Sequence, residues 1–151
     1  MPNLEVIEGA AIALISATGG ALLQDYLVRR ADRKDRQVQF AFKALLELQA
    51  AIGDLAVAAE QIDNRKRSSG SWDTGEHGLS WRALNKHRVR TIRYAALVGD
   101  RVLEQLSRAL EQAYYQFASA RSEAESTDER TRARELLYQT NTRIGAQFRA
   151  E

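Results

Sequence analysis

Apolar residues recur along the first half of the chain with alternating spacings of three and four, which is the pattern of one helix face turned toward a core. The positions of this first seam are Val38, Ala41, Leu45, Leu48, Ile52, Leu55, Ala59 and Ile62. They predict a helix over residues 31–63 that packs in the manner of a coiled coil. Neither Pro nor Gly occurs between Ala21 and Ile52, so we also expect this helix to continue unbroken from the N-terminal segment.

A second seam of the same kind lies in the C-terminal half. Its positions are Val89, Ile92, Ala96, Gly99, Leu103, Leu106, Leu110, Ala113, Phe117 and Ala120. They predict one helix over residues 81–121. Ser126 with Glu129 three residues later fits a capping box at the start of a last helix over residues 127–149. One side of that helix carries Ala133, Leu137, Ile144 and Phe148.

The N-terminal segment is uncharged from Gly9 to Gln24. As a helix this run is only about 24 Å long, whereas a helix needs about 20 residues to cross a bilayer core of about 30 Å. Apolar residues flank this run on both sides. Extending the run over residues 6–28 adds only Glu8 and Asp25 as charged residues. Five cations follow at once, at Arg29, Arg30, Arg33, Lys34 and Arg36. The pattern therefore predicts a single membrane span with its N-terminus outside, its C-terminal side in the cytoplasm and the cations on anionic lipid.

Small residues line one face of this segment. Gly9, Ala13, Ala17 and Ala21 recur every four residues. Such a face lets helices approach closely in a membrane, so it predicts self-association into a homo-oligomer. The competing interpretation is a buried, closely packed helix of a soluble bundle.

Taken together, the patterns predict an all-α protein in which an N-terminal membrane helix continues into an antiparallel three-helix bundle or coiled coil. The expected division is an anchor over residues 1–28 and a cytoplasmic bundle over residues 29–151. Residues 63–81 are rich in Gly, Ser, Asn and Asp and are expected to form a loop. We expect Trp72 and Trp81 to pin this loop onto the end of the bundle.

The chemistry available to the chain is narrow. It has no cysteine, so disulfides, thiolate metal sites and a cysteine nucleophile are excluded. The phosphate-binding and metalloprotease motifs and the Glu-x-x-His motif of di-iron bundles are missing from the sequence. His77 and His87 are expected to be solvated. We therefore expect no enzymatic activity, no cofactor and no metal.

Two basic stretches remain as a possible surface for another protein. One is Arg65, Lys66 and Arg67, and the other contains Arg88 and Arg90. In an antiparallel hairpin both flank the same loop, together with Trp72 and Trp81, so we expect them to converge at one end of the bundle. The net charge of the chain is only +2, which does not favour a nucleic-acid partner.

In layout the chain resembles a set of uncharacterised small bacterial single-pass proteins with a Gly/Ala-rich anchor, an Arg-rich juncture such as "LVRRADRKDR" and a helical tail. The resemblance covers mainly residues 9–36 and implies no activity. We expect a self-associating scaffold, adaptor or effector subunit at the cell membrane. One alternative is a pore former of the holin or toxin type, with Glu8, Gln24 and Asp25 along a polar path. The other is a cytoplasmic, soluble four-helix bundle that binds a protein.

Overall fold

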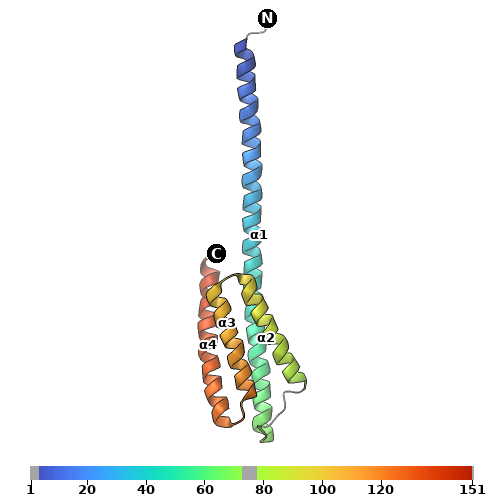
Figure 1. Ribbon diagram of the computed structural model, residues 1–151, viewed down its shortest axis with the longest axis vertical. Helices are drawn as coiled ribbons and strands as arrows, with labels where there is room; N and C mark the ends of the chain where they lie inside the picture. Colours follow the sequence, from blue (N-terminus) through green and yellow to red (C-terminus); the bar gives the residue numbers. More distant parts are fainter. Residues whose placement is uncertain (1–3, 73–77, 151) are drawn as a thin grey trace. The chain divides into compact units, whose positions relative to one another are not determined.

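The computed structural model describes the backbone of residues 4–72 and 78–150 and the side chains of residues 28–72 and 78–149. It contains four helices, which are α1 (Leu4–Ser69), α2 (Leu79–Val98), α3 (Arg101–Ser119) and α4 (Glu123–Ala150), as Figure 1 shows. The described part of the chain contains no strand, so the predicted all-α class is confirmed.

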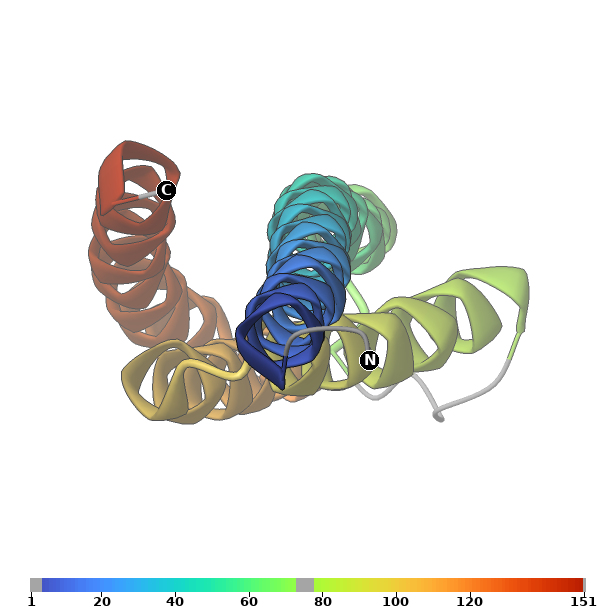
Figure 2. The same cartoon turned by 90° about the horizontal axis from the view of Figure 1, so that it is seen from above.

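The chain divides into two compact units, Met1–Gln39 and Phe40–Glu151. In the second unit, α2 and α4 lie on opposite sides of α3 when the bundle is viewed from above (Figure 2). Residues 40–69 of α1 pack against all three, through Arg90 of α2, a carbonyl of α3 and Phe148 of α4. This unit is therefore a bundle of four helices rather than the three that the sequence predicts.

The predicted membrane anchor, residues 1–28, falls almost wholly on residues whose side chains lie outside the described part. Among the helical residues with described side chains, no stretch is long and apolar enough to cross a membrane.

The first seam is confirmed from Leu45 to Ile62, where its side chains are buried in the core. Ala44, Ala51 and Ala58 widen the same face of α1. Val38, the first position of the seam, is 38% exposed, and Ala41, the second, is only partly buried. The bundle core therefore begins at Leu45, about two turns after the sequence pattern does.

The helix predicted over residues 81–121 is wrong, because the chain breaks between Val98 and Arg101. Gly99 adopts a left-handed backbone conformation with φ of 76°, and this conformation ends α2. Residues with a side chain rarely adopt it, so glycine is favoured at this position. Asp100 then begins α3, since its Oδ1 accepts from the backbone N–H groups of Val102 and Leu103 at 2.9 and 3.1 Å.

This break also changes which face of α2 is buried. The predicted seam holds in α3, where Leu103, Leu110, Ala113 and Phe117 are in the core. In α2 the buried face instead contains Trp81, Leu84, Thr91 and Ala95. The predicted positions Val89 and Ala96 are exposed, because a seam cannot keep its phase through a residue that leaves the helix.

The last helix begins one turn earlier than predicted, at Glu123. The Ser122 hydroxyl accepts from the Glu125 N–H at 3.2 Å, and the Glu125 carboxylate accepts from the Arg121 N–H at 2.7 Å. This reciprocal pair resembles a capping box and replaces the one predicted at Ser126 and Glu129. Ser126 is instead buried inside the bundle.

Candidate interaction surfaces

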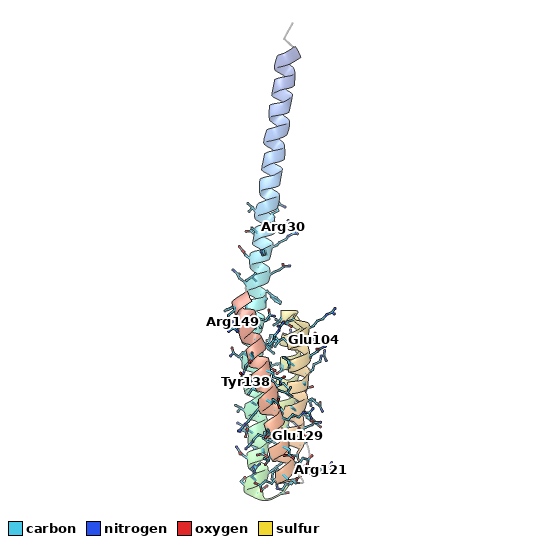
Figure 3. All side chains as sticks on the ribbon, turned by 90° about the vertical axis from the view of Figure 1, so that its left-hand side faces the viewer. Arg30, Glu104, Arg121, Glu129, Tyr138 and Arg149 are labelled. Carbon is cyan, nitrogen blue, oxygen red and sulfur yellow. The ribbon has the colours of Figure 1, made fainter. Side chains whose placement is uncertain are left out.

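The juncture in the first unit, residues 28–39, is exposed at every position. Figure 3 shows side chains projecting from both sides of α1 around Arg30. At about 100° per residue, the five cations of residues 29–36 lie within about 160° of the helix circumference. Asp32 and Asp35 occupy the remaining arc. Arg36 Nε also donates to the Asp32 carbonyl at 3.3 Å. The juncture therefore presents one cationic face, which can contact a surface of anionic groups.

The small face at Gly9, Ala13, Ala17 and Ala21 lies outside the described side chains. Backbone is described there, and it is helical throughout.

The first basic stretch is not an open surface, because Lys66 is buried with only 2% of its area exposed. Its Nζ donates to the carbonyls of Ala118 and Ala120 at 2.6 and 2.8 Å. These carbonyls end α3, where the helix dipole favours a cation. Burial lowers the pKa of Lys66, and the carboxylates of Asp63 and Glu125 partly offset that shift. Lys66 therefore caps α3 from α1, and its assignment to a partner surface is wrong.

Arg67 is held by carboxylates on two helices. Its Nε donates to Asp63 at 2.7 Å and its Nη1 to Glu123 at 2.7 Å. The hydrogen bond to Asp63 raises the pKa of the Arg67 guanidinium above its usual value, against the opposing effect of burial. Trp72 lies beside this guanidinium, with Cζ 5.7 Å from the ring centroid. Arg65, by contrast, is exposed.

A buried carboxylate joins α1 to α4 at this end of the bundle. Asp63 is fully buried and accepts from Ser126 Oγ at 2.5 Å and from Arg130 Nη2 at 3.1 Å. Arg130 also donates to Glu60 at 2.6 Å. Sequence reasoning missed this network, although Asp63 directly follows the seam residue Ile62.

The second basic stretch is neutralised within the bundle. Arg88 Nε donates to Glu111 of α3 at 2.5 Å, and its guanidinium lies 4.2 Å from the ring centroid of Tyr115. Trp81 also packs against Tyr115, edge-on, with ring centroids 6.0 Å apart. Trp81 is 4% exposed and belongs to the core, so it cannot serve as part of a partner surface.

Arg90 lies beside the bundle part of α1, at Glu47 and Asp54, rather than at the end of that helix. It donates to Asp54 at 3.1 Å and lies 3.6 Å from Glu47. Asp54 also lies 3.7 Å from His87, whose pKa is lowered mainly by burial. Since Asp54 precedes Arg67 by more than three helical turns, the two basic stretches do not converge as predicted.

Two shallow grooves lie on the described surface. One, of about 330 Å³ between α1 and α2, is lined by Phe40, Lys43, Ala44, Glu47, Tyr94 and Leu97. The other, of about 370 Å³ between α3 and α4, is lined by Leu106, Tyr138, Gln139, Thr142, Arg143 and Ala146. Tyr138 is 74% exposed and stands on the outer face of α4 (Figure 3). Within the described residues, no group of three or more His, Asp or Glu side chains is placed to hold a metal ion.

Comparisons with protein-family models, with curated proteins and with solved structures found no match to this chain.

Proposed function

We propose that the protein is a membrane-anchored, self-associating helical scaffold or adaptor subunit. In this proposal residues 1–28 anchor it, and the bundle lies on the cytoplasmic side of the cell membrane. The observation that carries the proposal is the juncture of residues 28–39. It is exposed at every position and begins four residues after an uncharged run of the sequence, with Asp25 between them.

Electrostatics supports the orientation. A cation near an anionic membrane surface contributes about 1 kcal/mol, and five cations in the juncture outnumber two carboxylates. No Lys or Arg precedes the uncharged run, so the asymmetry follows the rule that positive flanks stay in the cytoplasm. Helical backbone, which satisfies its own hydrogen bonds in lipid, is continuous through this region.

The structure of the bundle favours a scaffold over a unit that is itself embedded in lipid. Its core closes around side chains of all four helices, and cations between its helices, such as Arg67, Arg88 and Arg130, pair with its own carboxylates. Such a body can carry surfaces for other proteins while the juncture contacts lipid.

Membrane fractionation tests the anchor. The full-length protein should sediment with membranes and resist extraction by alkaline carbonate, and a reporter fused to its C-terminus should be cytoplasmic. Quantitative recovery in the supernatant without detergent would overturn the anchor and favour a bundle that works without a membrane.

A further inference from the structure

The outward side of α2 combines cations with exposed apolar side chains. Figure 2 shows α2 at one edge of the bundle, on the side of α3 away from α4. Six of its residues, at spacings of three and four, lie within about 80° of the helix circumference, opposite the buried Leu84 and Thr91. We call these six residues the basic outer face. They are Leu79, Arg82, Lys86, Val89, Arg93 and Leu97.

Charge distinguishes α2 from the other helices of the bundle. Its sequence contains five Lys and Arg residues but no Asp or Glu, whereas α1, α3 and α4 each contain carboxylates. Two of the five cations, Arg88 and Arg90, are neutralised by carboxylates of α3 and α1. The other three are exposed and form no ion pair with any carboxylate of the described residues. Three positive charges of the basic outer face therefore lack a counter-ion, at Arg82, Lys86 and Arg93.

Large apolar side chains flank these cations. Leu79, Val89 and Leu97 are exposed by 79%, 67% and 41%. Around the helix circumference the three cations fill the middle of the face, and the apolar residues lie on both sides of them. Leu97 also lines the groove of about 330 Å³ between α1 and α2, together with Phe40 and Tyr94. An occupant that covers this face must therefore bring both negative charge and apolar surface.

The order of charge and apolar surface disfavours two anionic occupants. A helix that enters the surface of a bilayer places its apolar residues in the middle of the inserted face and its cations at the sides, which is the reverse of the order here. Nucleic acid supplies phosphates for the cations but leaves Leu79 and Val89 without an apolar partner. A helix with a row of carboxylates between apolar side chains matches both parts of the face.

We infer that an acidic amphipathic helix of another protein docks along the basic outer face. The cations from Arg82 to Arg93 span eleven residues, or about 16 Å, so about three turns of the partner helix meet all of them. An apolar side chain of the partner can enter the groove beside Leu97. The inference rests on the adaptor role of the proposed function, for which it names the chemistry of the partner, and it does not need the membrane anchor.

A synthetic peptide provides the probe. It is a fluorescently labelled peptide of about 20 residues, long enough to form a helix, with Glu at alternating spacings of four and three, Leu on both sides of that row and Ala elsewhere. A second peptide carries Gln in place of every Glu. Fluorescence anisotropy measures the affinity of each for the full-length protein in non-ionic detergent. The Glu peptide should bind roughly tenfold more tightly than the Gln peptide, since each of three exposed ion pairs contributes about a factor of two.

Substitutions in the protein locate the contact. Replacing the three cations of the basic outer face by Gln should weaken binding of the Glu peptide roughly tenfold and flatten its dependence on salt. Val89→Gln should also weaken binding, whereas Val102→Gln on α3 should not, and neither should change thermal unfolding because both side chains are exposed. The matched control for the triple variant changes the net charge equally and should alter affinity by less than about twofold. It replaces by Gln three exposed cations elsewhere, which are Arg65, Arg101 and Arg121.

The outcomes separate the occupants. Equal affinity for the Glu and Gln peptides, or equal losses in the two triple variants, would overturn the docking face. If the triple variant of the basic outer face loses binding to vesicles of anionic lipid, or loses self-association, while its affinity for the Glu peptide is unchanged, the face meets lipid or a second copy and the inference is wrong. Sedimentation with membranes is measured separately, so a chain that stays in the supernatant but binds the Glu peptide would uphold the docking face and overturn the anchor.

Discussion

Replacing Asp63 by Asn should destabilise the bundle by about 3 kcal/mol. Removing one partner from a buried ion pair costs about 3–5 kcal/mol, because the other charge loses its compensation. Arg67 and Arg130 retain some contact with water, at 29% and 26% exposed, and each keeps a second carboxylate, so the low end of that range applies. For a chain of 151 residues this corresponds to a Tm lower by about 6–12 °C.

Urea unfolding of the full-length protein in mild detergent, followed by circular dichroism, measures this change. Asp54→Asn is the matched control, since its carboxylate also meets Arg90 but is 51% exposed, and it should cost about 0.5 kcal/mol. Ser126→Ala should lose part of the same free energy, and its effect should not add to that of Asp63→Asn, because the two residues share one hydrogen bond. If Asp63→Asn and Asp54→Asn unfold at the same urea concentration, the buried network does not hold α1 to α4.

Three further predictions concern other parts of the chain. Burial alone would raise the pKa of Asp100, but hydrogen bonds from the Leu103 N–H and from Arg143 hold it below its usual 3.8. The stability that Asp100 contributes is therefore present above that value and is lost as pH falls through the folded pKa. Acid should destabilise the wild type more steeply than the Asp100→Asn variant, and parallel profiles of unfolding free energy against pH would contradict this. Gly99→Ala should cost about 1 kcal/mol in thermal unfolding through its φ of 76° alone, since an added Cβ meets nothing within 4 Å, and Gly99→Asn should cost less; a cost for Asn equal to that for Ala would count against this. Replacing the five cations of residues 29–36 by Gln should weaken binding to anionic vesicles and its salt dependence, whereas the same change at five exposed cations of the bundle should not; equal losses would remove the special role of the juncture. That control set is Arg82, Lys86, Arg93, Arg101 and Arg121.

The seams of α1 and α3 could be predicted because apolar side chains repeat there without interruption. The face of α2 could not be predicted, since its buried positions include Thr91, and the predicted positions Ile92 and Ala96 each lie one residue after a buried one. Gly99 carried the missing signal. A glycine followed by Asp is typical of the end of one helix and the start of the next, and at residues 99–100 this local signal overrides the apolar spacing.

Lys66 shows why the candidate surface was misassigned. Three adjacent cations indicate an exposed surface when charge alone is considered. However, Lys66 follows Ile62 by four residues and so continues the buried seam of Leu55, Ala59 and Ile62. The hydrogen-bond partners of Lys66 could not be predicted from periodicity, because the carbonyls at the end of α3 lie more than 50 residues away in sequence.

The same long separations set the order in which the bundle can be completed during synthesis. Asp63 finds Arg130 only after a further 67 residues have been made, which takes roughly 3–13 s at about 5–20 residues per second. Throughout that interval the apolar face of α1 has left the ribosome without the helices that will cover it. The α3–α4 hairpin, by contrast, closes through neighbours in sequence as soon as it emerges. The nascent chain thus passes through a stage in which the apolar face of α1 is still without α3 and α4, the helices that supply most of its later cover.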